Sequence, residues 1–395
     1  MRIALWNACA LPNQGDRLID HCMKREIRRR IPEADIVTYS PWKADNTKLY
    51  IDFEGLWPGH RQFDAIIIGG GALLTGPPYM SPAEQFFMLG PYPERFQDTA
   101  PIHLFGICAD TTTLLPFGQS ASYAGAFARR ITTVNARNMH TADLISQFGC
   151  GTRTTISPDI VFSLPSIRPT RYKEGPRRVA YLASQSAFPE TTIRLMSDAY
   201  HKHACRIRPE LMDLKAGLAR REAAQDFSSG IVLDEHAQTV HRISAATGCK
   251  VTLVAFDNMY GDAQLQLLLR SLPLKFDSLT LVDSPAEDYI RALSQFDVVV
   301  ATRYHACILA ALAGCRVVGI DRSEPSLFGA SKLKALFDEN LKGELYIPRD
   351  KSNPELISDY VLKALQAEGS TKNADRAAKS VDKAFQSLCS FLLNS

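Results

Sequence analysis

The sequence predicts an α/β protein built from two parallel-sheet domains, and three observations support this prediction. At 395 residues the chain is long enough for two domains of ordinary size. Short apolar runs rich in β-branched residues alternate with segments of helical periodicity from one end to the other. These runs are continuously apolar, which is typical of parallel strands that helices cover on both faces.

Five apolar runs in the first half of the chain fit the strands of one sheet. They are residues 2–6, 35–39, 64–71, 102–108 and 131–137. Segments of helical periodicity lie between several of them. After the first run, for example, Ile19, Met23 and Ile27 mark one face of a helix. We therefore expect a first domain over residues 1–165.

The second half restarts the pattern after a segment without periodicity. That segment, residues 163–178, is rich in proline and basic residues, as interdomain linkers often are. The apolar runs that follow are residues 178–184, 250–256, 279–283, 298–302 and 316–321. We expect a second domain over residues 176–368. Residues 369–395 have the pattern of an amphipathic helix, which we expect to pack back on the first domain.

Composition and charge exclude several classes of protein. The chain has 45 basic and 42 acidic residues, a net charge of +3, which does not favour a nucleic-acid partner. No run approaches the roughly 20 apolar residues that span a bilayer, and the first residues lack a signal-peptide pattern. The nine cysteines include no C-x-x-C pair, and the nine histidines form no metal-binding motif. We expect a cytoplasmic protein without a transmembrane segment or a metal.

The densest basic run, MKREIRRR at residues 23–30, falls in a predicted helix. Its charges would spread over the solvent side of that helix. The alternative is peripheral contact of this run with an anionic membrane surface.

Candidate functional residues are expected at strand ends, because ligands of open parallel sheets bind beyond the carboxyl ends of the strands. In NQGD, Gly15 permits close approach of the backbone and Asp16 can cap the next helix, although an ordinary capped loop has the same pattern. The triplet in IIIGGG either opens backbone N–H groups to a ligand or lets a helix pack tightly. The candidates for lining a cleft between the domains are Asn13, Gly15, Asp16, Gly69, Gly70 and Gly71.

Two further residues of the first half lie near strand ends. Arg137 ends the run 131–137, and Asp159 follows a proline downstream. Each could belong to a structural ion pair or face the cleft.

The strongest candidates lie in VVVATRYHACILAALAG, where an apolar strand delivers Arg303 and His305 to the start of a small-residue helix. A buried arginine needs an anionic partner, and its planar fork suits a carboxylate or phosphate. A helix N-terminus also attracts anions. Ser323 and Lys332 follow the next strand and could reach the same edge, making a site for a small, multiply charged anion. An internal salt bridge with a satisfied histidine is the alternative.

Taken in order, four motifs resemble the polysaccharide pyruvyl transferase family over roughly residues 3 to 340. They are N-x-G-D at 13–16, IIIGGG at 66–71, ARN with SPDIVF at 136–162, and ATRYHACILAALAGCRVVGID at 301–321. The resemblance implies a GT-B-like pair of Rossmann-type domains. It also implies transfer of a pyruvyl group from phosphoenolpyruvate to a sugar, forming a ketal without a cofactor.

The resemblance assigns roles to several of these residues. Arg303 and His305 would bind phosphoenolpyruvate and act in catalysis, with Lys332, Arg137 and Ser323 also on the donor side. The cleft-lining candidates of the first domain would then face the acceptor. That acceptor would be a carbohydrate of exopolysaccharide or other polysaccharide biosynthesis, and it could be lipid-linked.

The chain departs from the family pattern at Asn138, at Cys108 and over residues 181–189, and these departures bear on the acceptor more than on the donor. Two other functions remain open. One is a glycosyltransferase of the same two-domain shape that uses a nucleotide sugar. The other is a non-catalytic family member that binds a sugar or assembles with biosynthetic enzymes.

Overall fold

The structure is a computed structural model of the 395-residue chain. It describes residues 1–7, 13–39, 42–44, 49–51, 63–74, 100–109, 131–146, 154–167, 176–182, 229–256, 262–270, 276–321, 331–367 and 371–394.

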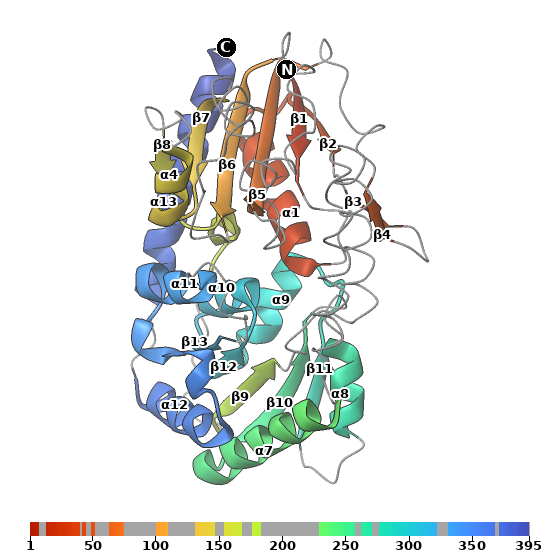
Figure 1. Cartoon of the computed structure of the whole chain (residues 1–395), viewed down its shortest axis with the longest axis vertical. Coiled ribbons are helices and arrows are strands. Elements are labelled where there is room, and N and C mark those ends of the chain that lie inside the picture. Colours follow the sequence, from red (N-terminus) through yellow and green to blue (C-terminus); the bar gives the residue numbers. More distant parts are fainter. Residues whose placement is uncertain are drawn as a thin grey trace, which may run out of the picture.

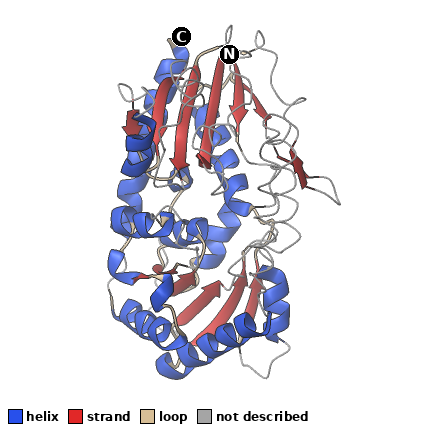
Figure 2. Ribbon diagram, viewed as in Figure 1, coloured by secondary structure: helices blue, strands red, loops and turns tan. Residues whose placement is uncertain are grey.

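Two six-stranded parallel sheets form the framework (Figures 1 and 2). The first sheet has the order β2 (Asp35–Tyr39), β1 (Arg2–Trp6), β5 (Ala65–Leu74), β6 (Ile102–Ala109), β7 (Ile131–Ala136) and β8 (Thr154–Ile156). The second has the order β11 (Asp277–Thr280), β10 (Lys250–Ala255), β9 (Arg178–Leu182), β12 (Val298–Ala301), β13 (Arg316–Ile320) and β14 (Tyr346–Ile347). A short antiparallel pair, β3 (Trp42–Ala44) and β4 (Leu49–Ile51), lies apart from both. The predicted two-domain α/β architecture is confirmed.

Helices follow most of the strands. They are α1 (Gln14–Arg30), α4 (Met139–Ile145), α7 (Ser229–Thr247), α8 (Asp262–Arg270), α9 (Ala286–Leu293), α10 (Tyr304–Leu312), α11 (Lys332–Asn340), α12 (Pro354–Gln366) and α13 (Thr371–Leu393), with 3₁₀ turns η5 (Ile160–Ser163), η7 (Gly343–Leu345) and η8 (Arg349–Lys351).

The two sheets point their carboxyl ends toward each other. In Figure 1 the arrowheads of the first sheet point toward the second domain, and that of β9 points toward the first, with α9, α10 and α11 between them. We call the units around the two sheets the first and second domains. Their predicted boundaries stay a prediction, because residues 168–175 of the linker lie outside the described part of the chain.

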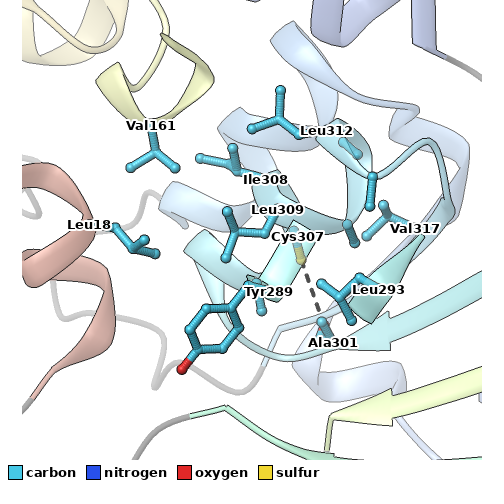
Figure 3. Packing of buried hydrophobic residues seen from close by; sticks show 14 of the residues in the cluster. Leu18, Val161, Tyr289, Leu293, Ala301, Cys307, Ile308, Leu309, Leu312 and Val317 are labelled. Carbon is cyan, nitrogen blue, oxygen red and sulfur yellow. Dashed lines mark hydrogen bonds between the residues drawn. The ribbon is translucent and has the colours of Figure 1, made fainter. Parts of the chain in front are cut away.

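Helix α10 is buried on all sides at the junction of the domains. Every residue from Ala306 to Leu312 is buried. Ile308 and Leu309 point toward Val161 of η5 and Leu18 of α1, and both sides belong to one continuous hydrophobic cluster (Figure 3). Burial of apolar surface therefore holds the two domains against each other.

Helix α1 begins differently from the sequence-based prediction. Asn13, and not Asp16, is the cap residue, since its side-chain oxygen accepts a hydrogen bond from the backbone N–H of Gly15 at 2.9 Å. Asp16 lies inside the first turn, where its negative charge favours the helix N-terminus.

The glycine triplet lies within β5 and not after it. Gly69 pairs with Phe105 and Gly71 with Ile107 of β6. Gly70 has φ of +79°, and a Cβ added there would lie 1.8 Å from Cγ2 of Ile19 on α1. The triplet thus allows α1 to pack tightly on the sheet, which is one of the two alternatives the sequence left open.

The C-terminal helix α13 packs back on the first domain, as predicted. Phe385 is fully buried, and its ring centroid lies 4.7 Å from that of Phe105 on β6. The basic run on α1 contributes to this contact, because Arg29 and Arg30 both form ion pairs with Asp382 of α13. Most basic residues of that run are therefore paired with acidic residues of the same chain. Within the described residues, no helix combines the length and the hydrophobicity that a bilayer-spanning segment requires.

One buried histidine makes the fold sensitive to pH. His103 on β6 is fully buried and its Nδ1 lies 2.8 Å from the Thr133 hydroxyl, while its Nε2 has no hydrogen-bond partner among the described residues. Burial lowers the pKa of His103 to about 4. Between the ordinary histidine pKa of about 6.5 and this value, the unfolded chain binds a proton that the folded chain does not.

We therefore expect the protein to lose stability as pH falls through this window. From about pH 7 to about pH 5, the free energy of unfolding should fall by about 2 kcal/mol more in the wild type than in His103→Gln. Urea titrations at the two pH values measure the difference. Parallel losses in the two proteins would contradict the prediction.

Candidate functional site

The candidate site lies where the N-terminal turn of α10 meets the N-terminal turn of α1. Strand β12 is buried throughout and lies between β9 and β13 in the second sheet. It ends at Ala301, so that Arg303, in an extended conformation, precedes the first helical residue, Tyr304. Arg303 and His305 thus emerge at the carboxyl end of a central strand, as predicted.

Arg303 forms an ion pair within the second domain. Its Nη2 lies 2.6 Å from Oδ1 of Asp262, the first residue of α8. Asp262 is 1% exposed, and its other oxygen accepts a hydrogen bond from the backbone N–H of Phe256 at 3.2 Å. The internal salt bridge considered from the sequence is therefore present for Arg303.

His305 faces a carboxylate of the other domain. Its Nε2 lies 3.5 Å from Oδ2 of Asp159, a distance too long for a good N–H···O hydrogen bond but short enough for an ion pair when the ring is protonated. Nε2 is buried and has no hydrogen-bond partner among the described residues. The Asp159 carboxylate is therefore the polar group that Nε2 faces within the described residues.

Asp159 is held firmly inside the first domain. It caps η5, where Oδ1 accepts the backbone N–H of Val161 at 2.9 Å, and Oδ2 accepts from Nη1 of Arg137 at 2.6 Å. Burial alone would raise the pKa of Asp159, but His305, Arg137 and the Val161 N–H together lower it below its usual range. A permanent negative charge thus lies beside the imidazole.

Aromatic contacts complete this cluster. The Tyr304 ring lies 4.5 Å from the Arg137 guanidinium carbon and makes an edge contact with the His305 ring at 5.2 Å between centroids. Burial raises the pKa of Tyr304 well above its ordinary value, so its hydroxyl stays neutral. Tyr304 therefore connects Arg137 of the first domain with the helix turn that carries His305.

Helix α1 closes the other side of the histidine. A Cβ added to Gly15 would lie 2.0 Å from Nδ1 of His305, so the helix backbone and the ring are in direct contact. Nearby, Gln14 donates to the backbone oxygen of Ser284 at 3.3 Å, and Arg17 forms an exposed ion pair with Asp283. The two helix N-termini therefore meet at the imidazole.

The remaining predicted residues lie around this centre or outside the described chain. Asp16 lies close to Gly71, since a Cβ added to that glycine would be 3.3 Å from Oδ1 of Asp16. Lys332 is exposed and begins α11, which packs on α10. Ser323 lies outside the described residues.

The departures from the family pattern have partial physical explanations. Asn138 caps α4, because its side-chain oxygen accepts the backbone N–H of Thr141 at 2.8 Å, and an aspartate would do the same. Its amide nitrogen lies 3.7 Å from the sulfur of buried Cys108. Tyr181 and Leu182 are buried in β9, and residues 183–189 lie outside the described chain.

The charges of the described cluster largely cancel. Arg303 is paired with Asp262 and Arg137 with Asp159, which leaves only His305 to add a positive charge on protonation. Within the described part of the chain, no group of three or more His, Cys, Asp or Glu side chains could hold a metal ion.

Comparison with solved structures defines the class of protein as a GT-B fold. Anabaena HepE, solved in complex with UDP and glucose, aligns over 100% of both chains with 13% identity and a TM-score of 0.51. A putative UDP-N-acetylglucosamine 2-epimerase from Listeria monocytogenes aligns over 98% of this chain and 94% of that chain, with 8% identity and a TM-score of 0.52. At such low identity the likeness shows the fold alone.

Comparison of the sequence with protein families then identifies the family. Residues 13–324 match polysaccharide pyruvyl transferase, and the chain belongs to this family. None of the curated proteins compared with the chain matches it. Membership of this family supports a transferase that modifies polysaccharides.

The contact between Gly15 and His305 yields a prediction for Gly15→Ala. The added methyl group would overlap the ring, so α1 or the imidazole must move, and overpacking of this kind costs about 1–3 kcal/mol. The free energy of unfolding from urea titrations should fall by that amount.

Gly343→Ala is the matched control. A Cβ at Gly343 would come close to the end of the Asp338 side chain, at 3.1 Å, which can rotate away, and its backbone neighbours at 3.9 and 4.0 Å are at ordinary contact distance. This variant should change the free energy of unfolding by less than about 0.5 kcal/mol. Equal stability of both variants and the wild type would show that Gly15 and His305 are not in contact.

Proposed function

We propose that this protein transfers a pyruvyl group from phosphoenolpyruvate to a sugar of a polysaccharide or glycolipid precursor, forming a pyruvate ketal. One observation supports this most: His305 lies in the first turn of a buried helix, and the ionised carboxylate of Asp159 faces its Nε2. Such a histidine is suited to carrying a proton, and proton transfer to carbon starts the proposed reaction.

The reaction balances without a redox cofactor. A proton adds to the methylene carbon of phosphoenolpyruvate, which becomes a methyl group and leaves a cation at the adjacent carbon. One sugar hydroxyl adds to that carbon and gives up its proton. The bond between the carbon and the bridging oxygen of the phosphate then breaks, and a second sugar hydroxyl adds to the carbon and closes the ketal. Of the two hydroxyl protons, one replaces the proton given to carbon and the other leaves with phosphate.

His305 would carry these protons. As an imidazolium it donates to the methylene carbon, and as neutral imidazole it accepts the proton of the first attacking hydroxyl. The negative charge of Asp159 stabilises the imidazolium between these steps, since the two groups lie 3.5 Å apart in a buried site.

The donor anion would bind at the N-terminus of α10. Phosphoenolpyruvate carries a carboxylate and a phosphate, and Arg303 offers a planar guanidinium beside a helix N-terminus. Because Asp262 already balances the charge of Arg303, the donor needs further cations and hydrogen-bond donors. We propose Lys332, Ser323 and Arg137 for this role, with the donor competing against Asp262 for Arg303.

The acceptor would lie on the α1 side of the histidine. Asp16 in the first turn of α1 suits hydroxyl groups better than phosphate, because its charge repels an anion. Asn13 and Gly15 shape the same turn, whereas Gly69 and Gly70 are used in strand pairing and close packing. The acceptor would thus approach His305 from the side of the ring on which Asp16 lies. The reaction would take place in the cytoplasm, where phosphoenolpyruvate is made.

Calorimetric titration with phosphoenolpyruvate tests the donor assignment. The wild type should bind it saturably, and Arg303→Gln should weaken binding about tenfold or more, since charged hydrogen bonds are worth about 1.5–3 kcal/mol. Asp262→Asn should bind at least as tightly as the wild type, because it removes the intramolecular competitor. If Arg303 served only as a structural ion-pair partner, Arg303→Gln would bind the donor as tightly as the wild type.

Arg291→Gln on α9 is the matched control, because Arg291 is 72% exposed and forms an ion pair with Asp288 of the same helix. It should bind phosphoenolpyruvate like the wild type, and thermal unfolding confirms that each variant is folded. UDP and UDP-glucose are titrated in parallel. Binding of the nucleotides alone would make the protein a glycosyltransferase, and binding of neither would favour a non-catalytic family member.

A further inference from the structure

We propose that Asp159 is a positioning residue for His305 that acts across the domain junction. It holds the neutral ring with its proton on Nε2 and leaves Nδ1 as the atom that exchanges protons with the substrate. The identity of that substrate rests on the proposed function, whereas the pairing of the two side chains does not.

The first support is the surroundings of Nε2. This atom is buried, has no hydrogen-bond partner among the described residues, and faces Oδ2 of Asp159 at 3.5 Å. A substrate atom cannot reach Nε2 without displacing Asp159. A ring movement of a few tenths of an ångström would turn the contact into a charge-assisted hydrogen bond.

The second support is the rigidity of the carboxylate. Oδ1 is fixed by the Val161 N–H and Oδ2 by Arg137, both in the first domain. A carboxylate oxygen has two acceptor positions, so Oδ2 can accept from Arg137 and from His305 together. The histidine of the second domain is therefore oriented by a carboxylate that cannot turn to follow it.

The tautomer follows from this arrangement. An acceptor facing Nε2 favours the neutral form with its hydrogen there, which leaves the lone pair on Nδ1. Nδ1 faces the first turn of α1, where Gly15 is in contact with it. The reacting carbon of the substrate should therefore lie beside this turn, between the N-termini of α1 and α10, where both domains contribute.

Other charges act on the same ring. Arg137 is positive and bound to Asp159, so loss of the aspartate would expose His305 to an uncompensated positive charge. Tyr304 is neutral, and the negative charge of Glu339 on α11 contributes to raising its pKa. Asp16 follows Gly15 in the first turn of α1. Because Asp159 has this second role, a test must separate the loss of its contact with His305 from the loss of its ion pair with Arg137.

Nitrogen-15 NMR of histidine-labelled wild type tests the tautomer without any activity. The His305 signals, assigned by their loss in His305→Asn, should show Nε2 protonated and Nδ1 unprotonated in the neutral ring. A neutral ring with its proton on Nδ1 would overturn the proposal. This result needs no substrate and no aspartate variant.

Kinetics of Asp159→Asn and of the double variant Arg137→Gln/Asp159→Asn test the effect on turnover. In Asp159→Asn, kcat should fall about 10–100-fold, by analogy with the loss seen when a group that orients a metal-binding histidine is removed. The basic limb of the kcat–pH profile should move to lower pH, since the imidazolium loses its partner. In the double variant this limb should move back toward its wild-type position, because the positive charge of Arg137 is removed as well.

The outcomes separate this proposal from the proposed function. An unchanged basic limb in a folded, donor-binding Asp159→Asn variant would overturn the positioning role while leaving pyruvyl transfer intact. If phosphoenolpyruvate is not bound at all, the proposed function fails, and the tautomer of the wild-type ring still decides the role of Asp159.

Discussion

Burial of α10 between two sheets is the constraint on which the rest of the structure depends. The helix is apolar and enclosed from Ala306 to Leu312, so polar side chains can occur only in its first turn. Arg303 and His305 are therefore confined to the turn where both domains meet. Since the same helix contacts the apolar faces of η5 and α1, the packing that joins the domains also fixes the histidine (Figure 3).

Buried charges at this junction need partners, and the two domains provide them differently. Arg303 is paired inside its own domain by Asp262, whereas His305 faces Asp159 of the other. Removing one partner of a buried pair leaves an uncompensated charge at a cost of about 3–5 kcal/mol. In the proposed function, Arg303 would bind the donor anion in competition with Asp262, and the contact between His305 and Asp159 would make proton transfer depend on the packing of the two domains.

Much of the fold follows from local patterns, because continuous apolar runs and amphipathic periodicity depend only on neighbouring residues. The two sheets and the return of α13 were predictable on this basis. The cap of α1 was assigned to Asp16 instead of Asn13, since both residue types cap helices and only the backbone decides between them. Asp262 was missed and Asp159 was not linked to His305, because those contacts join segments far apart in the sequence. The sequence did contain one signal for Asp262: it is an acidic residue at the start of the helix that follows strand 250–256.

In the proposed reaction, the methylene carbon of phosphoenolpyruvate would react beside His305 at the junction of the domains. Intermolecular nuclear Overhauser effects, measured with selectively labelled histidine at saturating phosphoenolpyruvate, test it most directly. We expect contacts between the methylene protons of the donor and the ring proton between the two nitrogens of His305. Saturated binding with contacts only to other histidines would contradict it.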